Sequence, residues 1–306
     1  MSAYIGRFAP TPSGPLHQGS LTAAVISWLD ARHHQGRWLL RIDDVDQPRT
    51  VPGAADAILR TLDAHGLHWD GPVVWQSTRD EAYHEALDQL RSAGRAFPCA
   101  CSRKEVLAAA LPGWEGPIYP GTCREGPPSG RKGRAWRLRM VQRQWVIEDR
   151  GLGPVGFDLH LLGGDFVIRR ADRVFAYQLA TVVDDLEAGV TDVVRGIDLL
   201  SSVPRQMQIY QALARKPPRY LHHPVVVAGC GEKLAKSSGA AAVDPRHATG
   251  ALVRVLRAIG IPDIEARDAA PGAGAVEALL DHAQRHWHPG QLPTGPIPAA
   301  TLAPEG

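Results

Sequence analysis

The segment Arg7–Ser20 combines residue types that suit a nucleotide-binding turn. It reads R-F-A-P-T-P-S-G-P-L-H-Q-G-S and joins a short strand-like start to a helical pattern. Unpaired N–H groups and the positive dipole end at a helix N-terminus favour phosphate. Gly14 and Gly19 let a ligand approach the backbone closely, and the prolines reduce the entropy lost on ordering. With Arg7 and His17 in the same loop, the pattern predicts a nucleotide site; an ordinary tight connection is the alternative.

A second segment, Lys233–Ser237, has the residue types of a phosphate-binding loop. Lys233 and Lys236 are three positions apart in a Gly-flanked loop that follows the apolar run 225–227. Only five of the 34 cationic residues are lysines, so a close pair is conspicuous. Two ammonium groups, the Ser237 hydroxyl and backbone N–H groups can bind phosphate oxygens. A solvated basic loop is the alternative.

A third group of residues could hold a metal ion. It consists of Cys99, Cys101, Tyr119 and Cys123. Zinc prefers four ligands in a tetrahedron and binds thiolates well. No histidine lies between His84 and His160, so the fourth ligand must be an oxygen from the tyrosine, a carboxylate or water. The alternative is three reduced structural cysteines. Cys230 lies outside this group, and we expect it to bind no metal.

The elements that position these residues follow an α/β pattern. Apolar spacing predicts a helix over 20–34, a buried strand over 38–42, and further helices around 55–62 and 78–94, the last with a capping box at 78–81. This start predicts a Rossmann-type, doubly wound parallel sheet. Later strands are predicted at 135–141, 166–169, 190–195 and 225–227, and later helices at 177–187, 202–210, 249–260 and 274–287.

Changes in composition divide the chain into five parts. Residues 97–134 are rich in Cys, Pro and Gly and have little periodicity, which indicates an inserted zinc-binding subdomain. The predicted parts are the first half of the catalytic domain (1–96), the insertion (97–134), the second half (135–245), a short helical C-terminal segment (246–291) and a disordered tail (292–306).

Composition limits the classes of function. The chain has 306 residues, 44% of them hydrophobic, and a net charge of +2, so a nucleic-acid partner would need a local basic surface. Its four cysteines do not form the pattern of a secreted disulfide framework. No apolar run approaches a membrane span, and the N-terminus lacks a signal pattern. We expect a cytoplasmic protein with no membrane partner, and a monomer.

Several segments together resemble the class I aminoacyl-tRNA synthetases. Arg7–Gly19 is similar to their first signature, the "HIGH" element, in its glutamate form R-F-A-P-[ST]-P-[ST]-G-x-L-H-x-G, and Lys233–Ser237 is similar to the second, "KMSKS". Three blocks between them also resemble the family, in the correct order: Leu40–Asp46, Ala176–Asp185 and Gly189–Gly196. The resemblance covers about residues 4–245.

The resemblance implies a role for each matching residue. The glutamate-binding residues would be Arg7, Phe8, Ala9, Pro10, Thr11, Asp43, Tyr177 and Arg195. The ATP-binding residues would be His17, Gly19, Lys233, Lys236 and Ser237, with Mg²⁺ accompanying ATP. His17, near the phosphates, and Lys236, which would stabilise charge on the α-phosphate, are the implied catalytic residues. Two arginines around one small acid fit carboxylate recognition and argue against glutamine.

The sequence departs from the family pattern at a few positions. Ser20 stands where the first signature has His or Gly, and Asp43 replaces the usual Glu and is one methylene shorter. Leu234-Ala235 replaces Met-Ser or Ile-Ser in the second signature. These differences affect fine geometry and leave the implied reaction class unchanged.

The length after the second signature bears on the acceptor. Roughly 70 residues follow Ser237, fewer than the ~100 of an independent domain for anticodon binding. The short C-terminal length resembles that of the shortened glutamyl-queuosine tRNA(Asp) synthetase family. The insertion with Cys99, Cys101, Tyr119 and Cys123 also resembles the insertion of that family. That resemblance implies glutamate activation without tRNA and transfer to the queuosine base in the anticodon of tRNA(Asp). The alternatives are a truncated glutamyl-tRNA synthetase charging the 3′ end of tRNA(Glu), a non-catalytic tRNA-binding paralogue, and a glutamate-adenylating enzyme that uses no tRNA.

Overall fold

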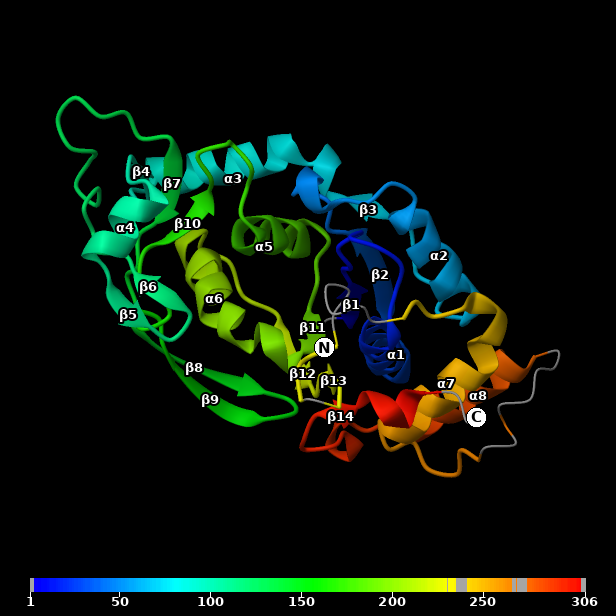
Figure 1. Ribbon diagram of the computed structural model, residues 1–306. Helices are drawn as coiled ribbons and strands as arrows, with labels where there is room; N and C mark the ends of the chain where they lie inside the picture. Colours follow the sequence, from blue (N-terminus) through cyan, green and yellow to red (C-terminus); the bar gives the residue numbers. More distant parts are fainter. Residues whose placement is uncertain (1–2, 230, 235–240, 266–267, 269–273, 304–306) are drawn as a thin grey trace.

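Two groups of parallel strands form the centre of the fold (Figure 1). The structure, a computed structural model, describes residues 3–229, 231–234, 241–265, 268 and 274–303. The first sheet has the order β1-β2-β3, with both pairs parallel, and consists of Ile5–Phe8, Arg37–Ile42 and Val74–Trp75. The second has the order β11-β12-β8-β9 and consists of Asp192–Gly196, Arg219–His223, Gln144–Asp149 and Gly153–Asp158.

The two sheets meet where β1 lies beside β11. The Thr191 N–H donates to the Ile5 carbonyl at 2.9 Å, and the Ile5 N–H donates to the Thr191 hydroxyl at 2.9 Å. In the second sheet, β11 and β12 are parallel, as are β12 and β8, whereas β8 and β9 form an antiparallel hairpin. The predicted parallel α/β core is therefore confirmed, and the hairpin is an addition to it.

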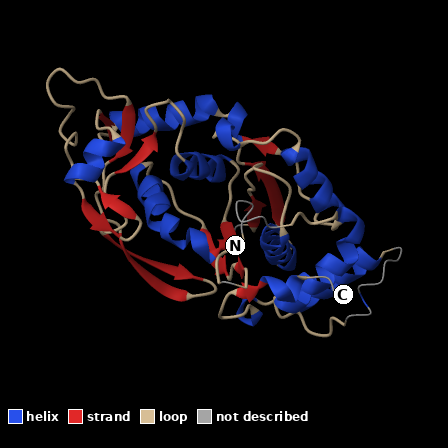
Figure 2. Ribbon diagram, viewed as in Figure 1, coloured by secondary structure: helices blue, strands red, loops and turns tan. Residues whose placement is uncertain are grey.

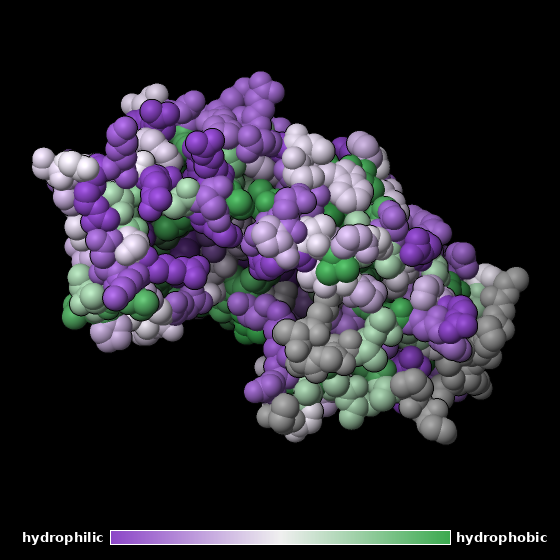
Figure 3. Space-filling model, turned by 45° about the horizontal axis from the view of Figure 1, so that its top comes forward, coloured by the Kyte–Doolittle hydropathy of each residue, from purple (hydrophilic) through white to green (hydrophobic). Residues whose placement is uncertain are grey.

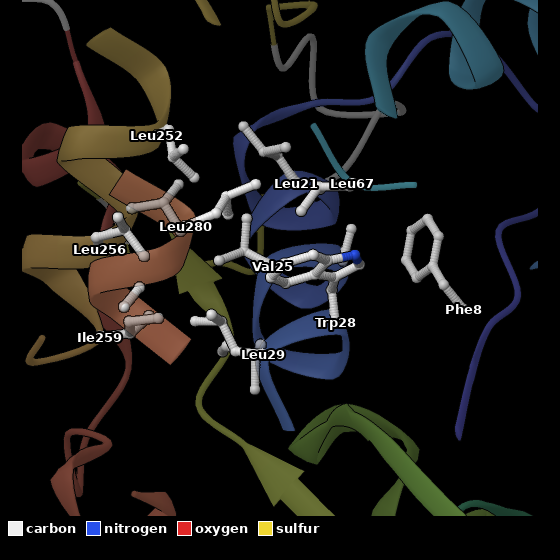
Figure 4. Packing of buried hydrophobic residues seen from close by; sticks show 14 of the residues in the cluster. Phe8, Leu21, Val25, Trp28, Leu29, Leu67, Leu252, Leu256, Ile259 and Leu280 are labelled. Carbon is white, nitrogen blue, oxygen red and sulfur yellow. The ribbon is translucent and has the colours of Figure 1, made fainter. Parts of the chain in front are cut away.

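Helix α1 (Gln18–His33) lies in the largest hydrophobic core. Its buried side chains Leu21, Val25 and Leu29 lie among residues of the two C-terminal helices, as Figure 4 shows. Those helices are α7 (Ala248–Ala258) and α8 (Ala275–His286). They match the helices predicted at 249–260 and 274–287, and they share one core with the N-terminal strand.

A second part of the molecule is built on an antiparallel sheet. Its order is β10-β7-β4, from Phe166–Arg169, Ala135–Leu138 and Ala96–Cys99. Helices α3 (Asp80–Ser92), α5 (Tyr177–Glu187) and α6 (Val203–Ala212) contribute to the core beside this sheet. Helix α2 (Ala54–Ala64) instead packs into the core around α1. Figure 2 shows how helices and strands are distributed over the molecule.

The insertion has more regular structure than its composition predicts. It contains α4 (Arg103–Ala109) and a hairpin of β5 (Leu111–Gly113) and β6 (Gly116–Ile118). Ser102 and Glu105 form a capping box at the start of α4. A small core of its own, including Phe97, Val106 and Tyr119, holds these pieces together.

Two predicted helix starts differ from the structure in their capping. Thr78 does not open α3; it ends a 3-10 turn (Gln76–Thr78), and its hydroxyl donates to the Trp75 carbonyl at 2.8 Å. Helix α3 begins at Asp80 without a side-chain cap. Ser202, the first residue of the helix predicted over 202–210 and a residue type that commonly caps helices, precedes α6, but its hydroxyl accepts from Gln178 at 3.1 Å and does not cap the helix.

The prediction of a disordered tail over 292–306 is wrong for its described residues. β14 (Ile297–Pro298) pairs in parallel with β13 (Val226–Val227), and Ala299–Leu302 forms a 3-10 helix. Ile297 and Leu302 are buried in the same core as α1. The segment is rich in Pro and Ala, but it also contains Ile297 and Leu302, which pack against a neighbouring strand and helix. Burial of these two side chains orders the segment.

The surface has a central hollow between the two ends of the molecule (Figure 3). Among the described residues, no helix is long and apolar enough to cross a membrane.

Candidate active site

A cavity of about 800 Å³ lies at the C-terminal ends of β1, β2 and β11. Ligands of open α/β sheets bind at this edge. The cavity is lined by every described residue that the sequence assigned to a small-molecule site: Arg7, Phe8, Ala9, Pro10, Thr11, His17, Gly19, Asp43, Tyr177, Arg195 and Lys233. Lys236 and Ser237 lie outside the described residues. Residues from both halves of the sequence therefore meet around one space.

A buried network of charges fixes one side of the cavity. Arg41 Nε donates to Asp43 Oδ1 at 2.7 Å, and Arg41 Nη1 donates to Asp185 Oδ1 at 2.7 Å. Arg7 Nε contacts the same Asp185 oxygen at 3.3 Å. Burial raises the pKa of Asp185, but Arg7 and Arg41 outweigh it and lower that pKa overall. For Asp43, burial outweighs Arg41 and raises the pKa.

Arg41, Asp184 and Asp185 lie within segments that resemble the synthetase family, but the resemblance assigned them no role. Asp184 accepts from Arg79 Nε at 2.6 Å and from Gln76 Nε2 at 2.7 Å. The contact between Arg41 and Asp43 could have been predicted from the sequence, because residues i and i+2 of a strand lie on the same face. The partners on α5 are known only from the fold.

Arg195 lies opposite this network with most of its donors engaged. Nη1 donates to Gln206 Oε1 at 3.0 Å and to the Tyr177 hydroxyl at 3.4 Å, and Nε donates to His222 Nε2 at 3.1 Å. Nη2 is buried and has no hydrogen-bond partner among the described residues. A buried cationic donor without a partner is costly, which suits a site that receives an anionic group.

The first predicted segment places His17 at the N-terminus of α1. His17 is the N-cap, and its ring accepts from the Ser20 N–H at 3.3 Å. The Ser20 hydroxyl lies 3.1 Å from the other ring nitrogen, so the residue that departs from the family pattern contacts the signature histidine. A Cβ on Gly19 would lie 3.1 Å from the His17 ring, which leaves little room for a larger residue.

Described residues that follow the second segment lie beside the first. Ala242 forms a bridge with His17, and the Val243 N–H donates to the Leu16 carbonyl at 2.8 Å. On the other side of the loop, Lys233 Nζ pairs with Asp198 Oδ2 at 2.5 Å. The first segment, Arg7–Ser20, therefore lies near the residues on both sides of the second, although more than half of the chain separates the two in sequence.

The predicted metal ligands are also brought together. The sulfurs of Cys99, Cys101 and Cys123 all lie within 4.8 Å of one another, and those of Cys101 and Cys123 are 3.6 Å apart. Bonds of about 2.3 Å in a tetrahedron give sulfur separations of roughly 3.8 Å, so the spacing fits zinc. The Tyr119 hydroxyl lies 3.5 Å from the Cys99 sulfur and 3.8 Å from that of Cys101. Cys230 lies outside the described residues.

The surroundings of Cys99 favour a thiolate, whereas burial and the neighbouring sulfurs raise the pKa of the Cys101 thiol. Burial raises the pKa of the Cys99 thiol, but hydrogen bonds with Tyr119 and Arg137 outweigh it and lower that pKa overall. The Arg137 guanidinium also lies 3.8 Å from the centre of the Tyr119 ring. A deprotonated sulfur is the form that binds metal.

Comparisons with known proteins find similar sequences over most of the chain. The family described as tRNA synthetases class I (E and Q), catalytic domain, matches residues 5–269. A Glutamyl-Q tRNA(Asp) synthetase of Chromobacterium violaceum is 50% identical over 96% of this chain and 97% of its own length. One of Dechloromonas aromatica is 53% identical over 94% of each chain.

Solved structures show the same fold at low sequence identity. A glutamate tRNA ligase from Elizabethkingia meningosepticum, in complex with its amino acid, superposes with a TM-score of 0.81 at 21% identity. The superposition covers 98% of this chain and 68% of that one.

Proposed function

The chain belongs to the family of class I tRNA synthetase catalytic domains for glutamate and glutamine, and from that membership we propose that it activates glutamate with ATP and transfers the glutamyl group to the queuosine base in the anticodon of tRNA(Asp). The names of relatives at 50% and 53% identity support the acceptor. The observation that carries the proposal is one cavity lined by Arg7, Arg195 and Asp43 together with His17 and Lys233.

The charges in the cavity suit glutamate. The carboxylates would be held by Arg7 and Arg195, which both line the cavity, because each guanidinium can donate more than one hydrogen bond to a carboxylate. Asp43 would face the ammonium group, and the Tyr177 hydroxyl would donate or accept beside Arg195. Glutamine would leave an arginine without a charged partner, which disfavours it. Phe8 to Thr11 would form the adjoining wall.

ATP would lie over the first segment, with its phosphates at the N-terminus of α1 near His17 and Gly19. A carboxylate oxygen of glutamate attacks the α-phosphorus, the bond to the bridging oxygen breaks, and pyrophosphate leaves. Lys233, Lys236 and Ser237 would stabilise the developing charge, since this chemistry depends on positioning and electrostatics. Mg²⁺ bound with ATP would neutralise phosphate charge.

In the second step, a hydroxyl of the queuosine cyclopentenediol attacks the acyl carbon of the glutamyl-adenylate. The ester bond forms, the bond from the acyl carbon to the phosphate oxygen breaks, and AMP leaves. We further propose that the protein acts on tRNA in the cytoplasm as a monomer.

For the insertion we propose one structural zinc ion held by Cys99, Cys101 and Cys123, with Tyr119 supplying the oxygen ligand. The ion would join β4 to the loop that contains Cys123. Its chemistry would be structural, because it would use all four coordination positions.

Acceptor identity is the decisive experiment. The protein is incubated with labelled glutamate, ATP and tRNA with or without queuosine, and the 3′ terminus is then cleaved off. The proposal requires label that stays with the body of the tRNA and depends on queuosine. Label released with the 3′ end would indicate a glutamyl-tRNA synthetase.

A simpler assay separates an enzyme from a binding protein. Glutamate-dependent exchange of pyrophosphate into ATP should occur without tRNA. It should be lost in Lys236→Ala and in Arg195→Ala. Absence of exchange in the wild type with every amino acid would contradict the activation step.

A further inference from the structure

A buried carboxylate–imidazole pair lies behind Arg195. Asp149 ends β8 and His222 lies on β12, and both side chains are fully buried. His222 Nδ1 lies 2.6 Å from Asp149 Oδ2, and His222 Nε2 accepts from Arg195 Nε at 3.1 Å. Because β11, β12 and β8 are adjacent strands, the three side chains form a line across the sheet, with Arg195 opposite His222 in register.

The hydrogen-bond partners determine where the imidazole proton lies. An arginine Nε–H can only donate, so His222 Nε2 must carry the lone pair. The ring proton is therefore on Nδ1 and points to Asp149. Asp149 Oδ1 is fixed in turn, because it accepts from the backbone N–H groups of Gly151 at 2.9 Å, Leu152 at 3.1 Å and His222 at 3.2 Å.

We propose that Asp149 and His222 are positioning residues for substrate recognition: they hold the imidazole in one tautomer, and through it they hold the Arg195 guanidinium in the orientation in which Arg195 lines the cavity and receives a substrate carboxylate. His222 fixes Nε, and Gln206 and Tyr177 fix Nη1, so the guanidinium plane is held at both ends, and among the described residues Nη2 has no hydrogen-bond partner. The assignment of glutamate as that substrate rests on the proposed function. A recognition group held this tightly loses affinity when its support is disturbed.

The variant Asp149→Asn tests the tautomer. Its single amide oxygen is claimed by the three backbone N–H donors, so its NH₂ group faces His222 Nδ1. The ring then carries its proton on Nε2, opposite the Arg195 Nε–H, and two donors face each other. In pyrophosphate exchange, KM for glutamate should rise roughly 10- to 100-fold, while KM for ATP stays within about twofold.

Two replacements of His222 separate positioning from packing. His222→Gln retains an acceptor near the Nε2 position and a donor for Asp149, and it should keep most of the glutamate affinity. His222→Leu removes both and should behave like Asp149→Asn. Glu148→Gln is the matched control, because Glu148 is exposed on the same strand and the change is again carboxylate to amide. Thermal unfolding establishes that each variant is folded.

Imidazole ¹⁵N NMR gives a readout that needs no activity. The wild type should show His222 protonated on Nδ1, and Asp149→Asn should show it protonated on Nε2. The inference is overturned by an Nε2 proton in the wild type, by an unchanged KM for glutamate in folded Asp149→Asn, or by equal losses in His222→Gln and His222→Leu. A wild type without exchange contradicts the proposed function instead, and the NMR result still decides the tautomer.

Discussion

Arg41 shows how one side chain can organise a binding site without being assigned to it. Its guanidinium contacts Asp43 and Asp185 at 2.7 Å each and Asp184 at 3.5 Å. Since Asp185 also pairs with Arg7, the orientation of both proposed glutamate contacts, Asp43 and Arg7, depends on this buried residue. A lysine ammonium is compact and lacks the planar fork of donors with which Arg41 contacts three carboxylates, so lysine is a poor replacement here.

Arg41→Lys should therefore weaken both the fold and glutamate binding. Breaking buried pairs while retaining the charge should lower the free energy of unfolding by about 2–4 kcal/mol. KM for glutamate in pyrophosphate exchange should rise because Asp43 and Arg7 lose their support. Urea unfolding and exchange kinetics measure the two effects. Arg91→Lys is the control, since Arg91 forms an exposed pair with Asp88; equal effects in the two variants would contradict the role of Arg41.

Three buried histidines predict a loss of stability in acid. Burial lowers the pKa of His65, His222 and His223 below 6.5, that of His223 to about 4. At pH values between the lowered pKa of each folded-state histidine and its usual 6.5, the unfolded chain binds protons that the folded chain does not. The free energy of unfolding therefore falls as pH falls through this window. Each histidine adds a slope of up to about 1.4 kcal/mol per pH unit.

Urea unfolding at about pH 7.5, 6 and 5 measures this slope. His65 lies outside the cavity and its ring bonds to the Thr61 carbonyl at 2.6 Å. His65→Asn keeps a donor there and does not titrate, so its slope should be shallower than that of the wild type. An identical slope would show that His65 does not resist protonation.

At the scale of single residues, the sequence predicted which groups would line one cavity but not what would hold them. Arg7, Asp43 and Arg195 follow from the family signatures. The partners of Arg41 and Arg195 lie on other elements, 144 positions away in one case and 27 in the other. Only the fold brings such pairs together, and a histidine or aspartate at the end of a strand has no distinguishing local pattern.

At the scale of elements, periodic segments were predicted well and alternating ones poorly. Helix α5 has the predicted bounds, Tyr177–Glu187. Strand β8 was missed although buried and exposed residues alternate along it, because its hairpin partner β9 contains Gly153, Pro154 and Gly156, which favour a loop. Strand β12 was missed because it carries two histidines, and the partners that allow one of them, His222, to be buried lie on other strands.

The proposed zinc site should stabilise the insertion as a unit. Purified protein should release about one zinc per chain on acidification, and Cys123→Ser should reduce this, because a hydroxyl is a poor replacement for a thiolate. Heating should then unfold the insertion first, while the core around α1, which shares no residue with the insertion's own core, keeps its midpoint. A zinc content near zero in the wild type would contradict the metal assignment. Ser102→Ala, which removes the cap of α4 but no predicted zinc ligand, is the control for destabilisation of the insertion without loss of metal.

At the scale of the whole molecule, the C-terminal segment is part of the main core. Leu302 is fully buried beside α7, although composition suggested disorder. Leu302→Ala should lower the free energy of unfolding by about 2–4 kcal/mol, because it leaves a cavity that neighbours only partly fill. Leu107→Ala, at a position 64% exposed, should change it by less than about 0.5 kcal/mol. Chemical denaturation measures both, and similar values would mean that the tail contributes nothing.

The pairing of β13 with β14 has a consequence for the newborn chain. β13 leads directly to Lys233 at the base of the second signature segment, yet its partner Ile297 is synthesised roughly 70 residues later, on the order of 4 to 14 seconds at the usual speed of translation. Until Ile297 is made, β13 has no strand partner in β14, and the second signature segment lacks the support of that pairing. In a nascent chain, the second signature segment should therefore gain this support only after Ile297 has been made, so competence to make an adenylate should follow the synthesis of β14.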